Sequence, residues 1–326
     1  MTRRARPLPP PFSDRPFSTA EARAAGVSPS RLRGRDLERP TRGVRVVRPV
    51  APRPIAAETA SHSERLADLR EDLVRRAREV APAVTPAQFF SHSTGLALLG
   101  APLPFRRDGA HPLHLSVRRP APQPRRTGVV GHRLQDRPGG RWIADGLPID
   151  HPARLWRQAA GGWDVDDIIA AGDFLICPRH RLITLDDLWD EVRVVGDVSG
   201  RKLHRALDEI RAGAETAEET RLRLAITRAG LPEPALNHDL RTDAGRFVAR
   251  LDLAYPRYRV GVEHDGRVHA FDEKQFARDA DRWDDIRREG WTHVRILSHH
   301  LRPDPARAVQ KVAEALLAAG WRGHGV

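Results

Sequence analysis

The feature that most constrains the fold is an ordered run of helical and β-type segments in the last third of the chain. A helix is expected over 217–230, because Leu222 and Ile226 lie at helical spacing and a Gly-Leu-Pro sequence ends the pattern. Three β-type segments, a second helix and a last strand follow it, with expected bounds 235–240, 247–255, 259–264, 276–291 and 293–297. Helices and strands combined in this way predict an α/β (α+β) fold.

Two acidic side chains lie on the hairpin that the second and third strands form around Pro256 and Arg257. On adjacent antiparallel strands, Asp252 and Glu263 are expected side by side at one end of the hairpin. Their strand neighbours are apolar, and a carboxylate pair with no basic residue next to it in the pattern indicates cation binding. Because carboxylate oxygens suit hard divalent cations, the expected cofactor is Mg²⁺ or Mn²⁺.

The order and spacing of these residues resemble the Vsr-like family of the PD-(D/E)XK nuclease superfamily, in a region also described as domain of unknown function 559. The resemblance lies in Asp252, in the sequence Glu-His-Asp-Gly that begins at Glu263, in His269, and in the charged helix and strand that follow. It implies a restriction-endonuclease-like core over 215–326, a mixed sheet flanked by helices. It also implies that Asp252 and Glu263 bind the metal, that His269 belongs to the active site, and that Glu219 is the acid of the family's leading helix.

Two features depart from that family. Asp265 stands where the superfamily usually has lysine, so the lysine charge near the attacking water is missing. The cysteine and histidine zinc ligands of Vsr repair enzymes have no counterpart, because Cys177 is the only cysteine. The mismatch specificity of those enzymes is therefore not carried over.

The chemistry of phosphodiester hydrolysis assigns roles to several residues. The reaction adds negative charge to the phosphoryl group, and a metal held by the two acids would neutralise that charge and orient water. We expect the backbone carbonyl of His264 as a further metal ligand, Asp265 as a third carboxylate, and His269 as general base or leaving-group acid. Arg278 and Arg282, four residues apart on the next helix, are expected to reach phosphate, whereas the other charges of that helix are expected on a solvated face.

The net charge of +12 is concentrated at the N-terminus. Residues 1–55 hold 13 arginines against four acidic residues, and the remainder of the chain is nearly balanced. A coding bias toward arginine would act on the whole chain, so the local concentration favours a segment that faces a polyanion. The expected partner is DNA.

The same segment has the layout of a helix-turn-helix. Ser18 and Glu21 form a capping box, Gly26 ends the first helix, and a second helix is expected from Pro29 to Leu37. A strand over 43–48 follows as a wing. The expected DNA contacts are Arg31, Arg33, Arg35 and Arg45. The alternative is a small structural hairpin whose arginines are only solvated.

The run from Phe17 to Leu32 and the Gly43-Val turn resemble the winged-helix N-terminus of AbiEi-type antitoxins, which belong to phage-defence toxin–antitoxin pairs. Residues 91–100 and 146–155 are similar to the central part of the same proteins. The resemblance implies a winged helix-turn-helix at 1–55 and an AbiEi-like α/β region at 56–214. The central region is expected to be a scaffold or to bind a partner protein of a defence operon.

Within the central region, helices are expected over 63–80, 152–160, 165–171 and 184–192, and strands over 114–117 and 129–132. Its histidines have neither ligand spacing on one helix nor a cysteine-pair partner. They are therefore predicted to be scattered structural or surface residues rather than a metal site: His92, His111, His114 and His132.

The single cysteine, Cys177, excludes an internal disulfide and any multi-cysteine metal site, which favours a reducing compartment. No apolar run approaches the ~20 residues of a membrane span, so a cytoplasmic location is expected. The leading hypothesis is a metal-dependent DNA endonuclease or nickase with an N-terminal DNA-binding module. The alternative is a non-catalytic AbiEi-like antitoxin or transcriptional regulator with an inactive nuclease fold, and a third hypothesis is an interaction partner in a defence operon.

Overall fold

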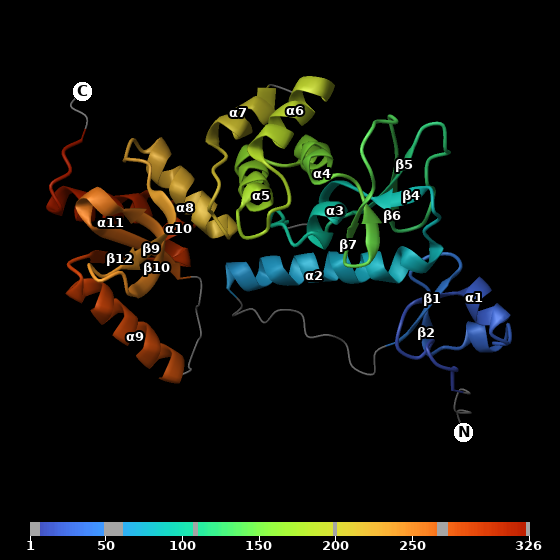
Figure 1. Ribbon diagram of the computed structural model, residues 1–326. Helices are drawn as coiled ribbons and strands as arrows, with labels where there is room; N and C mark the ends of the chain where they lie inside the picture. Colours follow the sequence, from blue (N-terminus) through green and yellow to red (C-terminus); the bar gives the residue numbers. More distant parts are fainter. Residues whose placement is uncertain (1–6, 49–60, 107–109, 198–200, 266–272, 324–326) are drawn as a thin grey trace. The chain divides into compact units, whose positions relative to one another are not determined.

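The computed structural model describes residues 7–48, 61–106, 110–197, 201–265 and 273–323, with side-chain detail from residue 281 onward in the last range. The chain forms two compact units, one of Met1–Ala57 and Leu66–Gly161 and the other of Glu58–Arg65 and Gly162–Val326 (Figure 1). The described residues combine helices with three β-sheets, so the predicted α/β class is confirmed. Among the described helices, none has the length and apolar composition needed to cross a membrane.

The N-terminal part of the first unit folds around a three-stranded sheet with the order β1-β3-β2. The strands are β1 (Phe17–Ser18), β2 (Leu37–Glu38) and β3 (Val44–Val47), and α1 (Thr19–Ala24) follows β1 directly. Ser18 caps α1 as expected, because its Oγ accepts a hydrogen bond from the Glu21 backbone N–H at 3.0 Å. Gly26, with φ of +81°, takes the left-handed conformation that stops the helix.

The expected second helix over 29–37 is wrong as an α-helix. Only a 3₁₀ turn forms, at Arg31–Arg33, and Gly34 then turns to an extended conformation with ψ of 144°. The Arg31 guanidinium holds Asp36 through two hydrogen bonds of 2.9 and 2.6 Å, and this ion pair closes over Gly34. A Cβ at position 34 would lie 2.4 Å from the Asp36 carboxylate, so the glycine is what permits this closure.

The rest of the first unit contains a five-stranded sheet with the order β6-β5-β4-β8-β7. Its strands are β4 (Gln88–Phe90), β5 (Leu113–Arg118), β6 (Val129–Leu134), β7 (Trp142–Ala144) and β8 (Leu147–Ile149), and its helices are α3 (His92–Leu98) and α4 (Pro152–Ala159). The expected strands at 114–117 and 129–132 and the expected helix at 152–160 are confirmed. Helix α2 (His62–Val80) also agrees with its expected bounds.

The second unit begins with three helices, α5 (Val165–Ile176), α6 (Leu185–Val195) and α7 (Lys202–Glu209). Thr184 caps α6 in a capping box with Asp187, as the sequence indicates. Helix α8 (Ala217–Arg228) follows and packs against α5.

The C-terminal part of the second unit is a four-stranded mixed sheet with the order β12-β11-β10-β9. Its strands are β9 (Ala235–Arg241), β10 (Phe247–Tyr255), β11 (Val260–Asp265) and β12 (Thr292–Leu297). Strands β9, β10 and β11 are antiparallel neighbours, and β12 pairs in parallel with β11. The order of elements therefore agrees with the expected helix, three strands, helix and strand.

Helices cover both faces of this sheet (Figure 1). Side chains of α8 and of α11 (Ala306–Ala318) share one apolar core with Val260 and Val262. Ile286 of α9 (Glu273–Arg288) belongs to a second apolar cluster, with Leu251 of β10. Helix α11 and the short α10 (Ser298–Leu301) extend the fold beyond the segments expected from the sequence.

Candidate functional site

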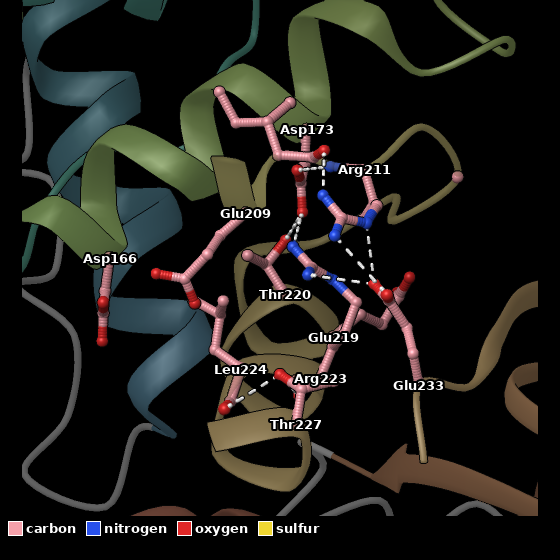
Figure 2. A network of polar contacts seen from close by, with 12 residues as sticks. Asp166, Asp173, Glu209, Arg211, Glu219, Thr220, Arg223, Leu224, Thr227 and Glu233 are labelled. Atoms are coloured by element: carbon pink, nitrogen blue, oxygen red, sulfur yellow. Dashed lines mark hydrogen bonds and ion pairs between the residues drawn. The ribbon is translucent and has the colours of Figure 1, made fainter. Parts of the chain in front are cut away.

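A buried ion pair between α5 and α8 fixes the position of α8, the helix that carries Glu219. Asp173 of α5 and Arg223 of α8 are almost completely buried and lie 2.8 Å apart (Figure 2). Asp173 also accepts hydrogen bonds from the Thr220 hydroxyl at 2.8 Å and from the Arg211 backbone N–H at 2.7 Å. Two of these three donors, Thr220 and Arg223, belong to α8, so the buried carboxylate fixes how α8 is rotated about its own axis.

Glu219 lies in the first turn of α8 and is 7% exposed. Its carboxylate accepts hydrogen bonds from neutral donors: the Glu215 backbone N–H at 2.9 Å, the Thr216 hydroxyl at 2.9 Å and the Asn237 amide at 3.2 Å. Burial is the main cause that raises its pKa. Glu219, which the resemblance assigns as the acid of the leading helix, is therefore buried and in contact with Asn237 of β9.

Asp252 and Glu263 lie where the β10–β11 ladder ends. The last paired residues are Leu253 and Val262, so the same register carried one step further sets Asp252 opposite Glu263. Instead of a further ladder bond, the Asp252 carboxylate accepts a hydrogen bond of 2.9 Å from the His264 backbone N–H. The expectation that the two acids meet at one end of the hairpin agrees with this register.

Burial and neighbouring charges perturb the ionisation of Asp252. Burial and the negative charges of Glu219 and Glu263 together raise the pKa of Asp252 to about 7, against the opposing effects of the His264 N–H and of Arg282. Three carboxylates from α8, β10 and β11 therefore share one electrostatic environment. We call Glu219, Asp252 and Glu263 the acidic cluster.

Arg282 and His293 hold Glu263, a contact that the sequence did not predict for either residue. Arg282 of α9 donates to Glu263 and also to the Arg250 carbonyl at 2.7 Å, and His293 Nε2 lies 2.9 Å from the Glu263 carboxylate. Arg282 was expected to reach phosphate, and its guanidinium lies instead in the acidic cluster. No sequence spacing links these two residues to Glu263, since they come from α9 and β12.

The remaining predicted residues have different surroundings. Asp265 forms an ion pair with Arg295, whose Nε lies 3.0 Å from the Asp265 carboxylate. The His264 backbone N–H binds Asp252, and burial lowers the pKa of its half-buried imidazole. His269 and the Arg278 side chain lie outside the described residues.

The predicted DNA-contacting arginines divide into two groups. Arg31 pairs with Asp36, and Arg45 donates to the Leu32 carbonyl at 2.8 Å and to the Val44 carbonyl at 2.7 Å, so both make structural contacts. Arg33 and Arg35 are exposed to solvent. Their contact with DNA stays a prediction.

The prediction of scattered histidines is wrong for three of the four. In the described ranges, one group of three metal-ligating side chains has ligand atoms within 4.8 Å of one another, and it consists of His92, His114 and His132. His111 stands apart, with its Nε2 3.0 Å from the Pro104 carbonyl. The residues come from three elements whose adjacency depends on β4 and α3, which the sequence patterns did not indicate.

Comparisons with known proteins place the chain beside two uncharacterized proteins. No family model and no solved structure matches it. The uncharacterized protein Rv2248 of Mycobacterium tuberculosis strain H37Rv and the uncharacterized protein MT2308 of strain CDC 1551 / Oshkosh are each 31% identical to it over 110 residues, or 34% of this chain. The chain covers 40% of the length of these relatives.

Proposed function

We propose that this protein is a metal-dependent DNA endonuclease or nickase of Vsr-like type, which acts in the cytoplasm and binds DNA through its arginine-rich N-terminal segment. The observation that carries the proposal is the acidic cluster at the end of the β10–β11 hairpin, in which Asp252 has a pKa raised to about 7. Acidic groups with perturbed pKa values that converge from separate elements are typical of catalytic sites.

The donor set fits a hard divalent cation. Asp252 and Glu263 offer carboxylate oxygens at the end of the hairpin, and the repulsion from neighbouring acids that raises the pKa of Asp252 is what a cation would relieve. Asp252 and Glu263, with the His264 carbonyl, would hold Mg²⁺ or Mn²⁺. When bound, such an ion neutralises charge on the phosphoryl oxygens and lowers the pKa of a coordinated water.

The chain's own residues supply positioning and positive charge. His293 orients the Glu263 carboxylate through its Nε2 contact of 2.9 Å. Arg282 brings a guanidinium from α9 into the site, which compensates for the missing lysine at position 265. A planar guanidinium can bind two phosphate oxygens at once, so Arg282 is suited to hold the scissile phosphate when a cation binds Glu263.

One observation favours the alternative, a non-catalytic regulator with an inactive nuclease fold. Glu263 already has two partners, Arg282 and His293, and Asp265 at the usual lysine position is paired with Arg295. In that case the cluster only stabilises the sheet end, and the protein acts through DNA binding or a partner of a defence operon.

A plasmid-nicking assay with Mg²⁺ or Mn²⁺ separates the two functions. Asp252→Asn and Glu263→Gln keep the shapes of the side chains and remove their charges, so we expect each to lower nicking about hundredfold or more, the order of loss seen when one group that stabilises the charge of a transition state is removed. Asp243→Asn, which changes an exposed carboxylate in the β9–β10 turn, is the matched control and should nick at the wild-type rate.

Two results would contradict the endonuclease. If wild type and both variants nick at the same low rate, the activity is a contaminant. If wild-type protein binds DNA with full affinity and nicks nothing in either metal, the regulator is supported.

A further inference from the structure

The second place where chemistry-bearing side chains converge lies in the first unit, on the five-stranded sheet. His92 begins α3 directly after β4, His114 is the second residue of β5, and His132 lies in β6. Strands β4, β5 and β6 are neighbours in this sheet (Figure 1). In the β5–β6 register His132 is opposite Ser116, two residues along from His114, so both side chains lie on the same face of the sheet.

The three imidazoles are close enough to share one ion. Their ligand atoms all lie within 4.8 Å of one another, and His114 Nδ1 is 2.8 Å from His132 Nε2. The ring centroid of His92 lies 3.9 Å from that of His132 and 4.8 Å from that of His114, and both pairs of rings are stacked. Nitrogens bound to one tetrahedral zinc at ~2.0 Å are about 3.3 Å apart, and because His92 stacks on both other rings, zinc binding requires its imidazole to turn out of the stack so that the three lone pairs converge.

His92 is held in an unusual backbone conformation. Its φ of 51° lies in the left-handed region, which is rare for a residue other than glycine. The His92 backbone N–H donates to Gln158 at 3.1 Å, and the Gln158 amide donates to the buried Asp150 at 2.8 Å. Strain that the surrounding structure maintains in this way is typical of functional positions.

Outer contacts also orient the ring of His92. Ser91 Oγ lies 2.9 Å from His92 Nδ1, and Ser91 Oγ accepts a hydrogen bond of 2.6 Å from the Ser116 hydroxyl. With Nδ1 donating to Ser91, the Nε2 lone pair of His92 is left for a ligand. Metal-bound histidines usually have such a partner on the other ring nitrogen.

The protonation state suits cation binding as well. Burial lowers the pKa of His92 to about 2 and that of His114 to about 4, and it also lowers the pKa of His132. All three rings are therefore neutral at pH 7, the form in which imidazole binds metals.

We propose that His92, His114 and His132 bind one Zn²⁺ ion per chain. Three imidazole nitrogens suit zinc, whereas the oxygen donors of the acidic cluster suit magnesium, so the two sites differ in metal as well as in unit. A set of three protein ligands leaves a fourth position for water, as in zinc sites that activate a water molecule.

The test is a zinc titration of the purified full chain after removal of metals, with Mg²⁺ present in excess to saturate oxygen sites. Calorimetry should give one Zn²⁺ per chain. Each of His92→Asn, His114→Gln and His132→Gln should weaken binding at least tenfold, and asparagine is chosen at position 92 because it tolerates positive φ. His299→Gln, which removes an exposed histidine elsewhere, should leave affinity and stoichiometry unchanged.

Co²⁺ as a spectroscopic probe keeps the proposal falsifiable if a variant fails to fold. Wild-type protein should give the intense visible absorption of tetrahedral Co²⁺, and one equivalent of Zn²⁺ should abolish it. Absence of this absorption together with absence of stoichiometric Zn²⁺ binding overturns the proposal. Unchanged Zn²⁺ affinity in a folded His92→Asn, His132→Gln double variant overturns it equally.

Discussion

At the residue scale, Asp252 carries an energetic cost that its neighbours impose. The charges of two other acids raise the pKa of its half-buried carboxylate, and the His264 N–H and the charge of Arg282 oppose that rise. A carboxyl group that ionises with difficulty in the folded state opposes folding once the solution pH would ionise it. Such a cost at one residue is expected where function rather than stability determines the side chain.

The pH dependence of stability measures this cost. The pKa of Asp252 is about 7 in the folded protein against an ordinary 3.8, so folded protein retains a proton that unfolded protein loses between pH 4 and pH 7. Stability from this group therefore falls as pH rises through that window and is constant above it. The Asp252→Asn variant does not lose stability in this way. The difference between its free energy of unfolding and that of wild type should therefore increase with pH, by at most about 4 kcal/mol above pH 7.

Urea denaturation at pH 4.5, 6 and 8 without divalent cations provides the measurement. Asp243→Asn serves again as the control, because its carboxylate is exposed, and it should follow wild type at every pH. A constant difference between Asp252→Asn and wild type across the range would show that Asp252 has an ordinary pKa.

The sequence predicted that Asp252 and Glu263 lie side by side, because the register of a hairpin sets which residues are opposite each other and side chains alternate between the two faces along a strand. It did not predict Arg282 and His293 as partners of Glu263, because these contacts depend on how α9 and β12 pack on the sheet. For the same reason, the closeness of His92, His114 and His132 could not be inferred from spacing along one element.

At the scale of elements, long periodic segments were predicted well and short ones were not. Strand β10 has the expected bounds, and α8 ends within two residues of its expected end. Strands β4, β7 and β8 have three residues each, too few for a period of two to stand out. A 3₁₀ turn forms at Arg31–Arg33 in place of the expected α-helix, and a local ion pair between Arg31 and Asp36 closes over Gly34.

The buried ion pair between α5 and α8 leads to a prediction about stability at this scale. Asp173→Asn would remove the nearer counter-charge of the buried Arg223 guanidinium and leave Glu233 at 3.9 Å, so the expected loss in the free energy of unfolding is at the lower end of the about 3–5 kcal/mol typical of breaking a buried ion pair. Replacing both partners, as Asp173→Asn with Arg223→Met, removes the uncompensated charge and should recover a large part of the loss. The double-mutant cycle is measured by chemical denaturation.

The control for this cycle is an exposed pair of the same type. Asp284 and Arg287 on α9 are about half exposed or more, and Asp284→Asn should change stability by less than about 0.5 kcal/mol. If Asp173→Asn is equally mild, the buried pair does not fix α8.

At the scale of the whole molecule, charge is distributed unevenly along the sequence. The N-terminal 55 residues supply most of the net +12, and their arginines differ in exposure. Arg31 and Arg45 are engaged in structural contacts, whereas Arg33 and Arg35 face solvent. Of the four arginines predicted to contact DNA, an electrostatic DNA-binding surface would therefore use the exposed pair.

The salt dependence of DNA binding tests this surface. Each phosphate contact contributes about 0.9 to the slope of log affinity against log salt, so Arg33→Ser with Arg35→Ser should reduce the slope by up to about 2 and weaken binding to any duplex sequence. Arg307→Ser with Arg322→Ser removes the same net charge from exposed positions near the C-terminus. If charge acts locally, only the first double variant changes the slope, whereas equal changes in both would mean that net charge alone attracts DNA and that the N-terminal segment has no special role.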